Sequence, residues 1–119
     1  MKTNSLFSFN DSDQTLLVKL GGEIDHHNAV AIRGEIDSEI RNHMPKKTVL
    51  DLSDIDFMDS SGLGLIMGRY SLMQKIGGEL TVKNPSHRII EIFELAGLGR
   101  MVRTENDNLY TRDNTEEKK

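Results

Sequence analysis

Two kinds of hydrophobic periodicity alternate along this 119-residue chain, and the alternation limits the folds that are open to it. Residues 15–21 (TLLVKLG), 47–52 (KTVLDL) and 79–83 (ELTVK) are short and mostly apolar, as strands of a buried sheet are. Between them, apolar residues recur every three or four positions over 28–44 and 60–76, which is the spacing of one helix face. Strands that alternate with helices predict a parallel sheet with right-handed crossovers.

The remaining segments complete a predicted element order of ββαβαβαβ. Residues 6–9 are predicted as a first strand, antiparallel to the second through a hairpin. Residues 86–96 are predicted as a third helix and residues 100–104 as a fifth strand, whereas the acidic run 53–59 is predicted as a loop. The expected fold is therefore an α/β domain whose sheet is mixed but mostly parallel, with four to five strands flanked by three to four helices.

The length of the chain indicates how many domains it forms, and its net charge limits the classes of partner that it can bind. A chain of 119 residues fits one domain, which we place at residues 1–105. Residues 106–119 contain two apolar side chains, Leu109 and Tyr110, and are predicted to be a flexible C-terminal tail. The net charge of −4 argues against binding driven by the charge of nucleic acid or of an anionic membrane.

The absence of cysteine excludes disulfides, iron–sulfur clusters and a cysteine nucleophile. No apolar run approaches the roughly 20 residues that span a bilayer, and the N-terminus lacks the apolar segment of a signal peptide. We therefore expect a cytoplasmic protein.

Polar residues concentrate where predicted strands lead into helices, at residues 23–27, 56–62 and 84–87. In a parallel sheet these three turns reach the same edge, where helix N-termini offer free N–H groups to ligands. Helix capping by Asp, Asn and Ser is the simpler interpretation of any single residue among them. In the second turn either Asp59 or Ser60 is expected to cap the helix, which leaves the other polar side chain at the helix start.

Three glycines, at positions 62, 64 and 68, fall inside the predicted second helix. Each glycine costs about 0.5–1 kcal/mol relative to alanine, so an offsetting role is expected. One candidate role is close packing of Gly64 and Gly68 against the sheet. The other is that Gly62 and Gly64 leave the helix start bare, so that another protein can approach the serine. The two roles are compatible.

Enzymatic readings of these turns fit the residues poorly. Ser60 or Ser61 with His26 or His27 and Asp25 has the composition of a hydrolase triad, but the residue two positions before either serine is not the glycine of a G-x-S-x-G elbow. We keep a small Ser/His/Asp hydrolase only as an alternative function, of a different class from a binding protein.

Metal and phosphate sites are equally weak interpretations. The adjacent histidines match no zinc spacing, and Asp54, Asp56 and Asp59 lack the pattern of a calcium-binding loop. The phosphate-binding motif G-x-x-x-x-G-K-[ST] is absent. We predict no metal and no cofactor.

Four short motifs in order resemble one family. Residues 57–64 (FMDSSGLG) resemble the phosphorylation loop of the anti-sigma factor antagonists in the STAS domain family, and residues 22–27 (GEIDHH) resemble that family's second hallmark. Residues 76–79 (IGGE) and 93–98 (FELAGL) also fit, and the likeness covers roughly residues 6–104. The sporulation members of the family are the nearest match, with the stress-response antagonists as the alternative.

The resemblance implies a binding module and not an enzyme. In that family the unphosphorylated antagonist binds a dimeric anti-sigma factor, which is also an ATP-dependent serine kinase, and thereby releases the sigma factor. Phosphorylation of the antagonist breaks the complex and a PP2C-type serine phosphatase restores it; neither nucleic acid nor a membrane is a direct partner. Truncation after Glu105 is expected to leave kinase binding largely unchanged, although family members commonly end in an amphipathic helix.

Carried over position by position, the resemblance places the phosphoacceptor at Ser60, the first serine after the aspartate. The remaining motif positions are implied to form the surface for the anti-sigma factor, and these are Asp25, His26, His27, Asp59, Ser61, Gly62, Leu63 and Gly64. A phosphate adds about 1.5–2 negative charges, and a helix N-terminus tolerates them. The switch is therefore expected to act at the interface, without refolding the domain.

Overall fold

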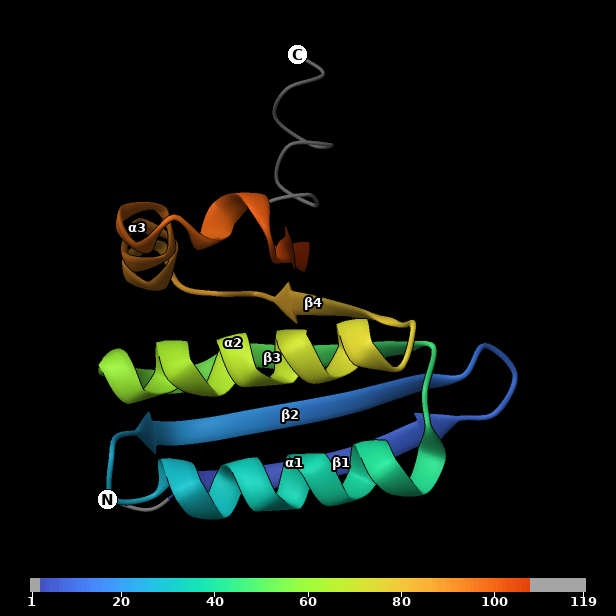
Figure 1. Ribbon diagram of the computed structural model, residues 1–119. Helices are drawn as coiled ribbons and strands as arrows, with labels where there is room; N and C mark the ends of the chain where they lie inside the picture. Colours follow the sequence, from blue (N-terminus) through green and yellow to red (C-terminus); the bar gives the residue numbers. More distant parts are fainter. Residues whose placement is uncertain (1–2, 108–119) are drawn as a thin grey trace.

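The computed structural model describes residues 3–107 and shows an α/β domain built on one five-stranded sheet (Figure 1). The strands lie in the order in which they occur in the chain: β1 (Thr3–Asn10), β2 (Thr15–Ile24), β3 (Lys47–Met58), β4 (Glu79–Lys83) and β5 (Arg103–Glu105). β1 pairs with β2 in antiparallel fashion, and every later pair is parallel. The predicted mixed, mostly parallel sheet is confirmed.

The three helices are α1 (Ala29–His43), α2 (Ser60–Lys75) and α3 (His87–Ala96), and a short 3₁₀-helix, η1 (Leu98–Arg100), follows α3. In Figure 1, α1 and α2 lie side by side across one face of the sheet, while α3 and η1 lie beyond β4. Each predicted helix is confirmed within one residue of its expected start. None of the helices in residues 3–107 has the length and apolar character needed to cross a bilayer.

Burial follows the periodicity from which the helices were predicted. The buried residues of α1 are Ile32, Ile36 and Ile40, which lie four residues apart and so share one face. The helix ends where Met44 adopts a left-handed conformation and its N–H donates to the carbonyl of Ile40 at 2.7 Å.

Alternate residues of the central strands pack against the helices. Leu16, Val18 and Leu20 of β2 are fully buried, as are Leu50 of β3 and Val82 of β4. Because side chains alternate along a strand, these residues share one face of the sheet and form a single core with the helices.

The prediction of a loop over residues 53–59 is wrong, because β3 continues to Met58. Its extension pairs with the last residues of β2, through Gly21 and Asp54 and finally Ile24 and Met58. Two register shifts along this pairing interrupt the alternation of apolar and polar residues, which explains why the segment looked like a solvated loop. β2 is likewise three residues longer than predicted, since it reaches Ile24.

The fifth strand begins later than predicted, at Arg103 instead of residue 100. Gly97 ends α3 in a left-handed conformation with a φ of 77°, and the chain then turns through η1. Leu98 and Val102 are buried on either side of this turn, so the segment is fixed by its apolar anchors before it pairs with β4.

The first residues after β5 are bound to the neighbouring strand end. The N–H of Asp107 donates to Asn84 Oδ1 at 2.8 Å, and its carboxylate forms an ion pair with Lys83 at 3.1 Å. The rest of the predicted flexible tail, residues 108–119, lies outside the described residues, so that its flexibility stays a prediction.

Candidate functional site

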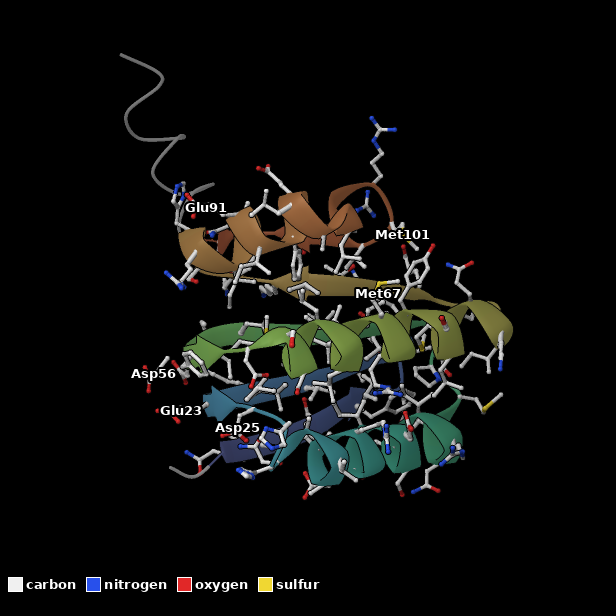
Figure 2. All side chains as sticks on the ribbon, turned by 60° about the vertical axis from the view of Figure 1, so that its left-hand side comes forward. Glu23, Asp25, Asp56, Met67, Glu91 and Met101 are labelled. Atoms are coloured by element: carbon white, nitrogen blue, oxygen red, sulfur yellow. The ribbon has the colours of Figure 1, made fainter. Side chains whose placement is uncertain are left out.

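Two strand-to-helix turns meet at the edge of the sheet where β2 and β3 end. The N–H of Asp59, just before α2, donates to the carbonyl of Ile24, the last residue of β2, at 3.1 Å. Figure 2 shows Glu23, Asp25 and Asp56 at this same end of the sheet. We call the residues of these two turns the two-turn surface: Asp25, His26, His27 and residues 59–64.

The first turn is closed by hydrogen bonds within residues 23–29. Asp25 Oδ1 accepts from the N–H groups of His27 at 2.9 Å and of Asn28 at 3.1 Å. The carbonyl of Asp25 accepts from the N–H of Ala29 at 2.9 Å, which begins α1. Asp25 therefore acts as the internal acceptor of its own turn and fixes the backbone of His27 and Asn28.

These contacts shift the acidity of Asp25. Desolvation acts to raise the pKa of its carboxyl, but the N–H donors of Asn28 and His27 and the nearby imidazoles outweigh that effect. The pKa of Asp25 is therefore lower than its ordinary value, and this side chain is ionised at neutral pH.

The two histidines are exposed, and their rings lie against one another. The ring centroids of His26 and His27 are 4.1 Å apart, with an angle of 36° between the ring planes. Together the rings present a polar, partly aromatic surface to solvent beside the carboxylate of Asp25, which is the kind of surface that a protein partner uses.

At the second turn, Asp59 is the cap of α2, and Ser60 is not. Asp59 Oδ1 accepts from the N–H of Ser61 at 2.8 Å. Ser60 is the first residue of the helix and is exposed, and its hydroxyl forms no hydrogen bond within residues 3–107. Ser61 is half-buried. The geometry thus separates the two serines, because Ser60 alone presents its hydroxyl freely to solvent.

The glycines of α2 differ in what surrounds them. A Cβ on Gly62 would overlap the side chain of Met58, so this buried glycine is required by packing, and the expectation that it leaves the helix start bare is wrong. A Cβ on Gly64 or Gly68 would meet no atom within 4 Å. The interpretation that Gly64 and Gly68 pack against the sheet is therefore wrong. Their helix surface is bare toward the outside of the molecule.

A shallow hollow of about 310 Å³ separates the starts of α1 and α2, and His26, Val30, Ser61 and Gly64 lie along it. Val30 is 61% exposed. On the other side of the serine turn, Phe57 is 48% exposed at the end of β3. Sequence reasoning did not select either apolar residue. Two exposed apolar side chains that flank a polar turn are typical of protein-binding surfaces.

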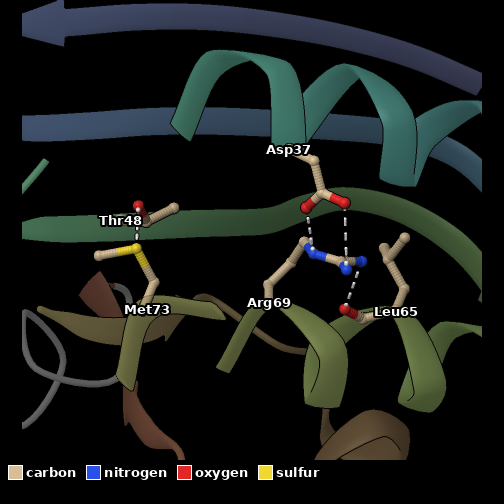
Figure 3. Close-up of polar contacts among 5 residues, drawn as sticks. All are labelled: Asp37, Thr48, Leu65, Arg69 and Met73. Atoms are coloured by element: carbon tan, nitrogen blue, oxygen red, sulfur yellow. Dashed lines mark hydrogen bonds and ion pairs between the residues drawn. The ribbon is translucent and has the colours of Figure 1, made fainter. Parts of the chain in front are cut away.

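An ion pair joins α1 and α2, the helices that follow the two turns (Figure 3). Arg69 Nε lies 2.9 Å from Asp37 Oδ1, and Arg69 Nη1 donates to the carbonyl of Leu65 at 3.1 Å. Burial lowers the pKa of the Arg69 guanidinium, and the carboxylate of Asp37 opposes that shift. Sequence reasoning missed this pair, although an arginine among apolar helix positions was a visible signal.

The third turn uses its polar groups within the fold. Ser86 caps α3 by accepting from the N–H of Ile89 at 3.2 Å. Asn84 contacts Asp51 and Asp107. The simpler capping interpretation therefore accounts for this turn, and it carries no part of the candidate site.

The arrangement does not favour the hydrolase alternative. His26 and Ser61 line the same hollow, yet no serine hydroxyl of the second turn is hydrogen-bonded to an imidazole in the described part of the chain. A nucleophilic serine needs a base within hydrogen-bond reach. Within residues 3–107, no group of three or more potential ligand side chains is placed to hold a metal ion.

The family model for the STAS domain matches residues 7–111 of this chain. Because that match spans most of the 119 residues, the chain belongs to the STAS domain family. Among members of the family, it is similar to an anti-sigma F factor antagonist of Paenibacillus polymyxa, with 38% identity over 87 residues, which cover 73% of this chain and 74% of that protein. An anti-sigma-B factor antagonist of Bacillus subtilis (strain 168) is 33% identical over 87 residues, covering 73% and 78% of the two chains.

Solved structures share the fold. The unphosphorylated form of the anti-sigma factor antagonist SpoIIAA superimposes with a TM-score of 0.73 and 27% identity, covering 92% of this chain and 94% of that chain. The phosphorylated form of the Bacillus SpoIIAA superimposes with a TM-score of 0.68 and 27% identity, covering 91% and 96%.

Proposed function

We propose that this chain is a cytoplasmic anti-sigma factor antagonist of the sporulation type. In this proposal the unphosphorylated protein binds a dimeric anti-sigma factor that is also an ATP-dependent serine kinase, and so frees a sigma factor. Phosphorylation of Ser60 ends the interaction, and a PP2C-type serine phosphatase reverses it. The antagonist itself performs no catalysis and needs no cofactor.

The observation that carries the proposal is the position of Ser60. Its hydroxyl is exposed at the first residue of α2, while the Asp59 cap and the half-buried Ser61 are engaged with the helix start and the hollow beside α1. A protein kinase can phosphorylate only a serine whose hydroxyl is exposed enough to reach the active site of the kinase. Ser60 meets this requirement better than Ser61.

The charge of the two-turn surface supports an effect at the interface. Glu23, Asp25 and Asp56 lie at this end of the sheet (Figure 2), and Asp59 directly precedes Ser60. A partner fitted to this surface has to accept four carboxylates already, so that about two more negative charges on Ser60 add repulsion and bulk. The exposed Phe57 and Val30 supply the apolar contacts that such a partner buries.

The comparison structures support a switch that leaves the fold intact. This chain superimposes on the unphosphorylated and on the phosphorylated form of SpoIIAA over more than nine tenths of its length. One fold therefore accommodates both states in that relative, and we infer the same here.

Phosphorylation with the purified anti-sigma kinase of the same organism, followed by mass spectrometry, tests the proposal. We expect one phosphate on the wild-type chain and on Ser61→Ala, and none on Ser60→Ala. Ser61→Ala is the matched control, because it removes the neighbouring hydroxyl and leaves the Asp59 cap on a backbone N–H. Phosphate on Ser60→Ala would contradict the proposal.

The relatives include antagonists of both the sigma-F and the sigma-B pathway. The sigma-F relative from Paenibacillus polymyxa is 38% identical to this chain, and the sigma-B relative from Bacillus subtilis is 33% identical. This difference supports the sporulation pathway in our proposal. Tighter binding to an anti-sigma-B factor than to an anti-sigma-F factor would move the chain to the stress-response group. Turnover of a generic ester that disappears in Ser60→Ala would instead favour a hydrolase.

A further inference from the structure

The side chain of Asn28 bridges the two sides of the first turn. Its Oδ1 accepts from the N–H of Asp25 at 2.9 Å, and its Nδ2 donates to the carbonyl of Glu23 at 2.8 Å. Asn28 directly precedes α1, where an asparagine ordinarily caps the helix. Here it makes no capping hydrogen bond with its side chain, and its backbone is already helical, with φ −107° and ψ −9°. The amide group therefore serves the turn and not the helix.

This bridge brackets the residue that joins the two turns. Ile24 lies between Glu23 and Asp25, and its carbonyl accepts the hydrogen bond from Asp59. By fixing the backbone on both sides of Ile24, Asn28 also fixes the direction of that carbonyl. This amide side chain therefore contributes to the position of the first turn relative to the start of α2, and so to Ser60.

The backbone of Asn28 acts on the same turn. Its N–H donates to Asp25 Oδ1 at 3.1 Å, beside the N–H of His27. One set of hydrogen bonds thus joins the carboxylate of Asp25, the backbone N–H of His27 and both the backbone and the side chain of Asn28. Asn28 itself is half-buried, whereas His26 and His27 are exposed.

We infer that Asn28 is a positioning residue of the partner surface, which holds Asp25 and His27 in register with Ser60 through its bonds to the backbone of Glu23 and Asp25. The inference rests on the proposed function and deepens it, because it names a residue that sets the shape recognised by the anti-sigma factor. Because Asn28 acts through the turn, its replacement is expected to weaken binding to the anti-sigma kinase. The rate of phosphoryl transfer within the bound complex is expected to stay the same.

The experiment compares Asn28→Ala with Asn10→Ala. Asn10 is the matched control, since its Oδ1 also accepts one backbone hydrogen bond, from Ser12 at 2.8 Å, at the opposite end of β2. With the purified anti-sigma kinase of the same organism as probe, we expect Asn28→Ala to bind about tenfold more weakly than Asn10→Ala. As a kinase substrate, we expect it to show a KM raised about tenfold and a kcat within about twofold of wild type.

Amide hydrogen exchange gives a readout that does not depend on the partner. In Asn28→Ala, we expect faster exchange at the N–H of Asp25, with the amides in the interior of the sheet unchanged. Asn28→Ser provides a second variant, because serine suits a helix start but is too short to reach Glu23 and Asp25 together. We expect it to behave like Asn28→Ala.

The outcomes separate the two proposals. A wild-type chain that fails to bind the kinase overturns the proposed function. Wild-type binding with both Asn28 variants within twofold of Asn10→Ala overturns this inference alone. A kcat that falls together with affinity would also overturn it, because Asn28 would then act on the delivery of Ser60 and not on the shape of the surface.

Discussion

Arg69 of α2 and Asp37 of α1 form an ion pair that is almost closed to solvent, with side chains 7% and 15% exposed. The pair joins the two helices whose N-termini carry the two-turn surface. Since α1 follows the first turn and α2 follows the second, the distance between these turns is set by how the helices pack. A contact well away from Ser60 therefore contributes to the geometry around it.

Arg69→Met is expected to destabilise the protein by about 1–3 kcal/mol, because it leaves the half-buried Asp37 carboxylate without its partner. The free energy of unfolding in urea measures this effect. Replacing both residues, as Arg69→Met with Asp37→Leu, should recover most of the loss. Lys19→Ala removes an exposed ion pair with Asp54 and should change stability by less than about 1 kcal/mol. A loss for Arg69→Met no larger than for Lys19→Ala would contradict this prediction.

Phosphorylation of Ser60 is expected to abolish tight kinase binding and to leave the fold unchanged. Ser60→Ala should stay bound to the anti-sigma factor, because it keeps a small uncharged side chain at the helix start. Ser60→Asp should bind poorly and keep a native spectrum, with a partial effect since its charge is lower than that of phosphate.

Amide NMR spectra of the two phosphorylation states check this account. We expect shifts near residues 57–64 and 24–28, which the hydrogen bond between Asp59 and Ile24 connects. Large shifts across β4 and α3 would show that the switch is conformational, even with Ser60 as the correct site.

Gly64→Ala is expected to stabilise the free protein and to weaken partner binding. A Cβ at this position meets no atom of the chain within 4 Å, and alanine favours a helix by about 1 kcal/mol over glycine. The same methyl group would occupy the surface that we propose for the partner. Thermal unfolding and binding affinity, measured on the same samples, check both halves of the prediction.

Gly34→Ala is the matched control, because Gly34 is exposed in α1 and a Cβ there is equally free. It should raise stability to a similar extent and leave binding unchanged. Unaltered binding of Gly64→Ala would remove Gly64 from the two-turn surface. Gly62→Ala, by contrast, should destabilise the protein through overlap with Met58.

Asp51 is expected to make stability fall in mild acid. Desolvation acts to raise its pKa, but donors from Ser53 and Asn84, together with Lys19, outweigh it and hold the pKa below its ordinary value. Because the folded-state pKa is lowered, this contribution is present above the unfolded pKa and is lost as pH falls through the folded pKa. Asp51→Asn should flatten the decline in unfolding free energy between about pH 5 and pH 3, and should cost about 1 kcal/mol at pH 7. An unchanged slope would contradict the assignment.

Removal of residues 108–119 is expected to leave both kinase binding and melting temperature nearly unchanged, since that segment contributes few apolar side chains. Truncation after Glu105 should also preserve binding, but it removes the contacts of Asp107 with Lys83 and Asn84 and should lower stability by about 1 kcal/mol. A large fall in melting temperature when only residues 108–119 are removed would show that this segment packs on the domain.

The helices and most strands could be predicted because their signals are local. Ile32, Ile36 and Ile40 repeat at the helical period, and Pro85 with Ser86 marks a helix start. The extension of β3 could not be predicted, because its pairing depends on bulges against β2 that leave no regular pattern in either segment.

The site was predictable in position but not in detail. The convergence of two turns follows from parallel topology, so their residues could be placed together in advance. Whether Asp59 or Ser60 caps α2 depends on backbone angles, and the role of Asn28 depends on bonds across a folded turn. The Arg69 and Asp37 contact depends on helix packing between residues far apart in sequence.

The unequal lengths of β3 and β4 affect how readily another protein can reach Ser60. β4 pairs with β3 only as far as Asp51, and β3 then continues for seven more residues, roughly 20 Å, before α2 begins. Ser60 therefore stands well beyond the end of β4, with no lid among the described residues to open before another protein reaches it. An enzyme that modified Ser60 would therefore meet an exposed residue and need no prior opening of the described part of the domain.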